Sequence, residues 1–289
     1  MKRIPTFASL FLAIAIGWPA FAGVVFTSVT KTVPERGRAQ EARMRGMAEG
    51  ENMRIEFLEG GRGQAQQGDY MLARGDGTIY LVDPDDESYM SVDADQMSQL
   101  MGSMGKVVEM DIDNVSVETL VDERGPRMNG YPTRHVKLKT SYDMSIGVMG
   151  IKRTRNVARE EELWLAQGVE LPAVDVWRKQ ATAMMGSEEL EELVEAERGK
   201  WKGFPLKTIT VTTTTDRRGS TDTQRTEMVV ESLEETNVAA SRFELPEGYR
   251  DVTPDLSGAM DRQPAGGSSG QNGGRKMPDI GGILQKLGE

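Results

Sequence analysis

The chain has 289 residues, no cysteine, one histidine and a formal net charge of −10 at pH 7. Without cysteine the fold has no disulfide, no thiol chemistry and no lipid-modified N-terminal cysteine, so it must be stable through packing alone. The acidic balance argues against nucleic acid or an anionic membrane surface as a partner.

Residues 1–22 have the pattern of a secretory signal peptide. Two basic residues precede an apolar run, Phe7–Ile16, that is too short to stay in a membrane as a spanning helix. Small residues at Ala20 and Ala22 fit cleavage by signal peptidase before Gly23. We therefore expect cleavage between Ala22 and Gly23, no stable membrane anchor, and a periplasmic or otherwise extracytoplasmic, secreted protein. An uncleaved anchor is the less favoured alternative.

Strand patterns dominate residues 23–250, which we interpret as a single domain. Met53, Ile55 and Phe57 alternate with charged residues, the period of a half-buried antiparallel strand. Turn residues separate further strand patterns. These are predicted at 70–73, 79–82, 89–92, 115–121, 135–140, 162–165, 207–215 and 221–233.

Two groups of helices are expected to interrupt these strands. The first, at 95–106, has an apolar stripe at i, i+3, i+4 and i+7, formed by Met97, Leu100, Met101 and Met104. The second begins at Pro172, restarts at Ser187 and ends before Gly199, with Trp177 and Met184 on its first apolar face. The pattern predicts an α+β fold in which helices cover one face of a long antiparallel sheet.

The stretch SRFELPEGY, residues 241–249, is predicted to close the fold. Phe243 and Leu245 share one side of an extended segment, Pro246 ends its capacity to pair, and Tyr249 seals the core edge.

Residues 251–289 are rich in glycine, proline and serine, and we expect a flexible tail that buries little apolar surface. An apolar pattern near its end, at 280–287, is a candidate contact for a protein partner. Two glycines inside that pattern favour the flexible interpretation.

Five fragments resemble a known family. They are GENMRIEF at 50–57, GDGTIYLVDPDDESY at 75–89, NGYPTRHV at 129–136, EELWL at 161–165 and SRFELPEGY at 241–249. Together they resemble an exported bacterial family known as domain of unknown function 4412, which is similar to the periplasmic lipoprotein carriers LolA and LolB. The resemblance implies a LolA-like fold. This is a long curved antiparallel sheet, an incomplete barrel, covered on one face by inserted helices.

No enzyme, cofactor or metal site is predicted. His135 is the single histidine, and no nucleophile motif accompanies it, so a histidine of the sheet surface is favoured over a catalytic base. The acidic runs at 83–87 and 111–114 are interpreted as hairpin turns. Calcium binding by these runs is the alternative that the sequence leaves open.

The methionine stripe at 95–106 has three interpretations. It is the core of a helix, the lining of a pliable ligand cavity, or, least favoured, a Cu(I) site. The cavity hypothesis takes seven residues as the lining: Met97, Leu100, Met101, Met104, Trp177, Met184 and Met185.

These observations predict a non-catalytic extracytoplasmic binding protein. In this hypothesis a lipid, an acyl chain or a lipid-modified protein binds in a hydrophobic cavity between the curved sheet and the helices. The alternative is a periplasmic protein-interaction or envelope-sensing module that has no small-molecule ligand and uses its C-terminal tail to contact a partner.

Overall fold

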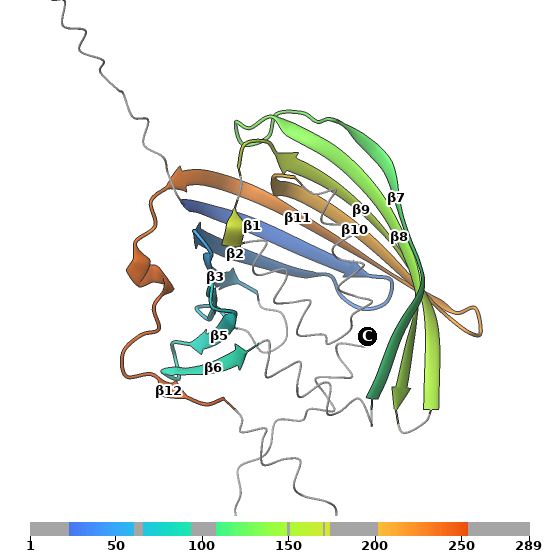
Figure 1. Ribbon diagram of the computed structural model, residues 1–289, viewed down its shortest axis with the longest axis horizontal. Helices are drawn as coiled ribbons and strands as arrows, with labels where there is room; N and C mark the ends of the chain where they lie inside the picture. Colours follow the sequence, from blue (N-terminus) through green and yellow to red (C-terminus); the bar gives the residue numbers. More distant parts are fainter. Residues whose placement is uncertain are drawn as a thin grey trace, which may run out of the picture. The chain divides into compact units, whose positions relative to one another are not determined.

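The computed structural model describes residues 23–60, 66–93, 108–148, 151–169, 171–173 and 202–253. They form one sheet of twelve strands in the order β12-β6-β5-β4-β3-β2-β1-β11-β10-β9-β8-β7 (Figure 1). The strands are β1 Gly23–Pro34, β2 Gln40–Glu49, β3 Asn52–Glu59, β4 Tyr70–Ala73, β5 Thr78–Asp83, β6 Ser88–Asp93, β7 Val108–Arg124, β8 Thr133–Val148, β9 Ile151–Ala166, β10 Phe204–Asp216, β11 Thr221–Thr236 and β12 Arg250–Asp251.

The first strand lies in the middle of the sheet. β1 pairs antiparallel with β2 on one side and with β11 on the other, so that Gly23 faces both Glu49 and Thr236. From this centre the sheet extends through β2, β3, β4 and β5 to β6 on one side, and through β11, β10, β9 and β8 to β7 on the other. Neighbouring strands are antiparallel except β12, which pairs parallel with β6 over two residues.

The two faces of the sheet follow from the alternation along each strand. The inner face is defined here by Phe26, Gly46 and Ile55, which face one another across β1, β2 and β3. It holds the largest core cluster, in which the rings of Phe26 and Phe204 meet edge to face at 5.0 Å. The buried members are Val24, Ala48, Met53, Ala73, Ile79, Ala166, Val169, Ala173, Phe204, Leu206 and Val230.

The C-terminal segment 237–252 covers the outer face of the N-terminal strands. Val238 and Phe243 pack on Met47 of β2. Farther along, Leu245 and Tyr249 pack against the cluster of Tyr70, Leu72 and Val82 on β4 and β5.

The prediction that SRFELPEGY closes the fold with its aromatic side chains is therefore confirmed. Its local form differs from the prediction, because Phe243 ends the 3-10 turn η1, Ala240–Phe243, and does not lie in an extended segment. A turn of this kind directs Phe243 onto the sheet while the chain crosses the strands.

The prediction of an α+β fold covered on one face by inserted helices is wrong. The described residues are nearly all sheet, and their helical parts are η1 and the two residues Pro172–Ala173. Helical periodicity is a local signal, whereas the strands of this sheet are selected by pairing between distant segments. The stretches at 95–106 and 174–199 lie outside the described residues. No helix in the described ranges is long and apolar enough to span a membrane.

Candidate ligand-binding face

The seven residues predicted to line a cavity lie outside the described part of the chain. They are Met97, Leu100, Met101, Met104, Trp177, Met184 and Met185. The candidate site described below therefore consists of other residues, which lie on the strands themselves.

An apolar patch occupies the inner face of β2–β5. Its members are Met44, Ile55, Phe57, Met71 and Leu81, linked by the pairs Met44–Phe57, Ile55–Met71 and Met71–Leu81. Residues directly opposite each other in a ladder share a face, so these side chains form one continuous surface. Four of them are half-buried, and Leu81 is 42% exposed.

Alternation along the strands keeps charge away from this patch. On β3, Arg54 and Glu56 point to the outer face, where their side chains form an ion pair at 2.8 Å. The guanidinium of Arg54 also lies 3.6 Å from the centre of the Tyr70 ring. Burial raises the pKa of the Tyr70 phenol above its ordinary value, against the lowering effect of Arg54.

The sequence predicted only part of this patch. The alternation of Ile55 and Phe57 indicated an apolar face of a strand, whereas Met44, Met71 and Leu81 were not assigned to a site. A signal for Met44 exists, because Ala42, Met44 and Ala48 alternate with charged or outward residues along β2.

His135 lies on the outer face, in a network of carboxylates. Its Nε2 lies 2.8 Å from Glu162 and its Nδ1 3.3 Å from Glu123, while its ring stacks on Trp164 at 4.8 Å. Both ring nitrogens face carboxylate oxygens of side chains on the neighbouring strands. This geometry is that of a sheet-surface histidine, as the sequence predicted.

The two acidic runs differ in structure. Asp83 accepts hydrogen bonds from the backbone N–H groups of Asp85 and Asp86, each at 3.0 Å, which confirms the hairpin turn at 83–87. The run at 111–114 is not a turn. It lies within β7, at a bulge where Asn114 has φ 55°. Among the described residues, no three His, Asp or Glu side chains are grouped as a metal site would require.

Ion pairs and amide contacts lower the pKa values of several carboxyls. The Arg134 hydrogen bond lowers the pKa of Asp122, and hydrogen bonds from Asn156 and Asn114 lower that of Asp143. On β11, the hydrogen bond from Lys207 lowers the pKa of Glu227. None of these carboxyl groups belongs to the apolar patch.

Solved structures that are similar to the chain include the following two. The crystal structure of an uncharacterized conserved protein from Thermus thermophilus is 10% identical, with 81% of this chain and 92% of that chain covered, at a TM-score of 0.37. That of a LolA superfamily protein from Nitrosomonas europaea is 8% identical, with 78% of this chain and 91% of that chain covered, at a TM-score of 0.30. No relative is found among curated proteins.

The model of one protein family, described as a domain of unknown function (DUF4412), matches residues 21–249. The match covers most of the chain and includes all five fragments on which the sequence-based resemblance depends. The chain belongs to the DUF4412 family.

Proposed function

We propose that the protein is a non-catalytic binding protein that holds an acyl chain on the apolar patch of its inner face. In this proposal the chain is exported by the leader expected at residues 1–22. The observation that supports it most is the exposure of Leu81 within a continuous surface that also contains Ile55 and Met71. A contiguous apolar surface that stays partly exposed marks an interaction site more often than scattered apolar residues do.

The chemistry of the patch suits flexible chains. Two of its five members are methionines, whose unbranched thioethers repack around ligands of different shape. A sheet surface contacts a chain from one side, so roughly half of each methylene leaves water. Binding of an acyl chain with about 14 methylenes would then be favoured by a free energy on the order of 6 kcal/mol. This corresponds to a dissociation constant of tens of micromolar.

Charge substitutions at matched sites test this proposal. Leu81→Glu places a carboxylate in the patch. The control, Leu120→Glu, places a carboxylate on β7, outside the patch, at a position that is 41% exposed. We expect Leu81→Glu to weaken binding of a fluorescent fatty-acid probe at least fivefold, because a carboxylate must be desolvated beside the acyl chain. Leu120→Glu should leave binding unchanged.

Both variants should unfold at urea concentrations close to that of the wild type, since both positions are exposed. The proposal is wrong if the wild-type protein does not bind the probe. It is also wrong if Leu120→Glu weakens binding as much as Leu81→Glu does.

A further inference from the structure

Threonine dominates one strand on the inner face. Along β10 the inner face carries Thr208, Thr210, Thr212 and Thr214, whereas Ile209 and Val211 point to the outer face. Threonine fits strands well for reasons of backbone propensity alone. At the start of β10, Phe204 and Leu206 belong to the main core cluster on the inner face. From Thr208 on, the inner face carries hydroxyls, while Ile209 and Val211 point to the outer face, and strand propensity alone does not explain this division.

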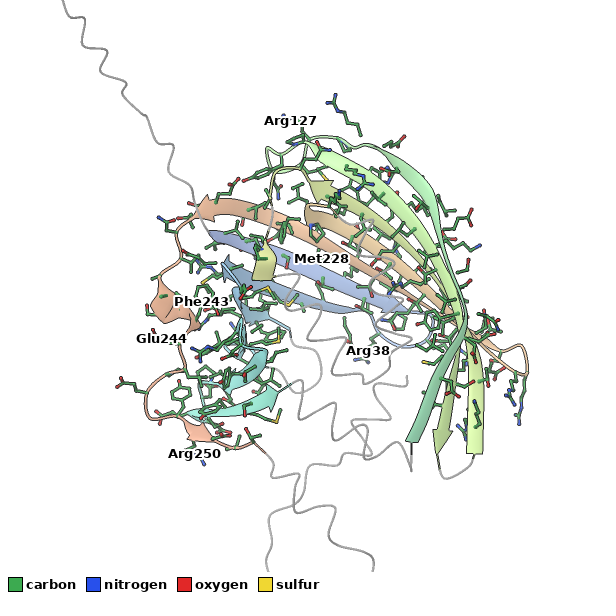
Figure 2. All side chains as sticks on the ribbon, viewed as in Figure 1. Arg38, Arg127, Met228, Phe243, Glu244 and Arg250 are labelled. Atoms are coloured by element: carbon green, nitrogen blue, oxygen red, sulfur yellow. The ribbon has the colours of Figure 1, made fainter. Side chains whose placement is uncertain are left out.

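The hydroxyls continue across two neighbouring strands. Thr210 faces Thr226 on β11, which faces Thr32 on β1, and the next row runs from Thr208 through Met228 to Thr30. Met228 is labelled in Figure 2 and marks this part of the sheet. Strands lie about 4.8 Å apart and alternate residues about 6.7 Å apart, so these hydroxyls form a two-dimensional array. The threonine band consists of Thr30, Thr32, Thr208, Thr210, Thr212, Thr214 and Thr226.

Part of the hydrogen-bonding capacity of the threonine band is available. The hydroxyls of Thr32 and Thr226 lie 3.3 Å apart, and Thr210 donates to Glu161 at 3.4 Å. Within the described residues, no hydrogen bond joins Thr212 or Thr214 to another side chain. Each such hydroxyl offers one donor and two acceptor positions.

The threonine band borders the apolar patch directly. On β2, Met44 of the patch faces Ser28 of β1, and the preceding inner-face residue, Ala42, faces Thr30 of the band. One face of the sheet thus passes from methionine and aliphatic side chains to hydroxyls across a single strand. A ligand that lies on both parts must itself be amphiphilic.

We propose that the threonine band binds the sugar headgroup of a glycolipid whose acyl chain lies on the apolar patch. This inference rests on the proposed function and names its ligand class. Sugar hydroxyls donate and accept hydrogen bonds, as threonine hydroxyls do, whereas a phosphate only accepts and favours a net positive site. The band itself carries no charge, and the inner-face neighbours of Thr210 and Thr212 on β9, Glu161 and Arg159, have opposite charges.

The test uses two double variants on the same strand. Thr212→Val/Thr214→Val removes two hydroxyls from the inner face, and Thr213→Val/Thr215→Val removes two from the outer face. Valine is close to threonine in shape and favours strands, so both variants should keep the fold. Binding of dodecyl maltoside, dodecanoate and dodecylphosphocholine, each below its micelle concentration, is measured by calorimetry.

We expect the inner-face variant to bind dodecyl maltoside about tenfold more weakly, the effect of losing one or two ordinary hydrogen bonds. Its affinity for dodecanoate should be unchanged, and the outer-face variant should resemble the wild type with all three probes. Unchanged maltoside affinity in the inner-face variant, with normal dodecanoate binding, would overturn this inference and leave the proposed function intact. Stronger wild-type binding of dodecylphosphocholine than of the maltoside would assign the site to phospholipids and also overturn it. If the wild type binds neither these probes nor the fluorescent fatty acid, the proposed function itself fails.

Discussion

Gly46 shows how one missing side chain shapes the inner face. It lies opposite Phe26 in the ladder between β1 and β2. A Cβ at this position would overlap Cζ of the Phe26 ring, far inside any van der Waals contact. The backbone of Gly46 is not among the positive-φ glycines, so the requirement for glycine here comes from the ring alone.

Replacing Gly46 with alanine should therefore destabilise the protein by forcing Phe26 away from Phe204. Overpacking of this kind costs about 1–3 kcal/mol of unfolding free energy, measured by urea denaturation. The double variant Phe26→Leu/Gly46→Ala removes the clash, and its loss of stability should be smaller than the sum of the two single losses. Additive losses would show that the Phe26 ring is not the cause of the stability lost in Gly46→Ala.

At this scale the sequence predicted Ile55, Phe57 and Phe243 correctly as parts of apolar surfaces. The residues of the patch on β2, β4 and β5 were missed, because a single methionine or leucine in a short strand carries no period of its own. The methionine stripe at 95–106 attracted the site prediction because helical spacing is visible within one segment. Contact between Met71 and Ile55, in contrast, depends on a register that only the folded sheet supplies.

The C-terminal segment 237–252 acts as a fixed strap over the outer face of the N-terminal strands. It is anchored by Phe243 on β2, by Tyr249 against β4 and β5, and by the parallel pairing of β12 with β6. The hydroxyl of Thr253 also accepts the backbone N–H of Ser91 at 2.8 Å. This contact lies three residues beyond residue 250, the domain boundary expected from composition.

Phe243 and its neighbour Glu244 provide a matched pair for measuring the strap (Figure 2). Phe243 is 6% exposed within the Met47 cluster, and Glu244 is exposed. Phe243→Ala should lower the unfolding free energy by about 3–5 kcal/mol, the usual cost of removing a buried phenylalanine, and Glu244→Ala by less than about 0.5 kcal/mol. Equal effects in thermal or urea denaturation would show that the strap adds nothing through Phe243.

Strands with β-favouring residues and clear turns were easier to predict than strands made of helix-favouring residues. The hairpin of β10 and β11 was predicted from its threonines and its turn at 216–219, and the structure confirms it. β2, in contrast, was missed, because its sequence QEARMRGMAE consists largely of residues that favour helices. Pairing with β1 and β3 overrides that preference.

For the whole molecule, lowered carboxyl pKa values predict loss of stability in acid. Asp122, Asp143, Glu227 and Asp251 each have a folded pKa below the ordinary value, mainly through hydrogen bonds to their charged forms. Such groups stabilise the folded state above their unfolded pKa, and this stabilisation disappears as the pH falls through the folded pKa. The decline should therefore begin below about pH 4.5.

The urea midpoint, measured from pH 7 to pH 3, checks this expectation. Protonation also relieves the net charge of −10, which acts in the opposite direction, so the comparison between variants is decisive. Glu227→Gln lacks one of the contributing carboxyls and should show a shallower decline than the wild type. A steeper decline in Glu227→Gln would contradict the assignment of Lys207 as the group that lowers this pKa.

The central position of β1 also determines when the sheet can be completed. β1 can pair with β2 as soon as both strands are present. Its other partner is β11, so Gly23 can pair with Thr236 only after more than 200 further residues are available. Contacts between such distant segments form slowly, because the chain loses much loop entropy before they give any stabilisation. When the chain is synthesised or exported with its N-terminus first, one edge of β1 therefore stays unpaired until β11, near the end of the domain, becomes available. During that interval this edge is open to pairing with the wrong strand, so folding in the cell should depend on chaperones that shield it.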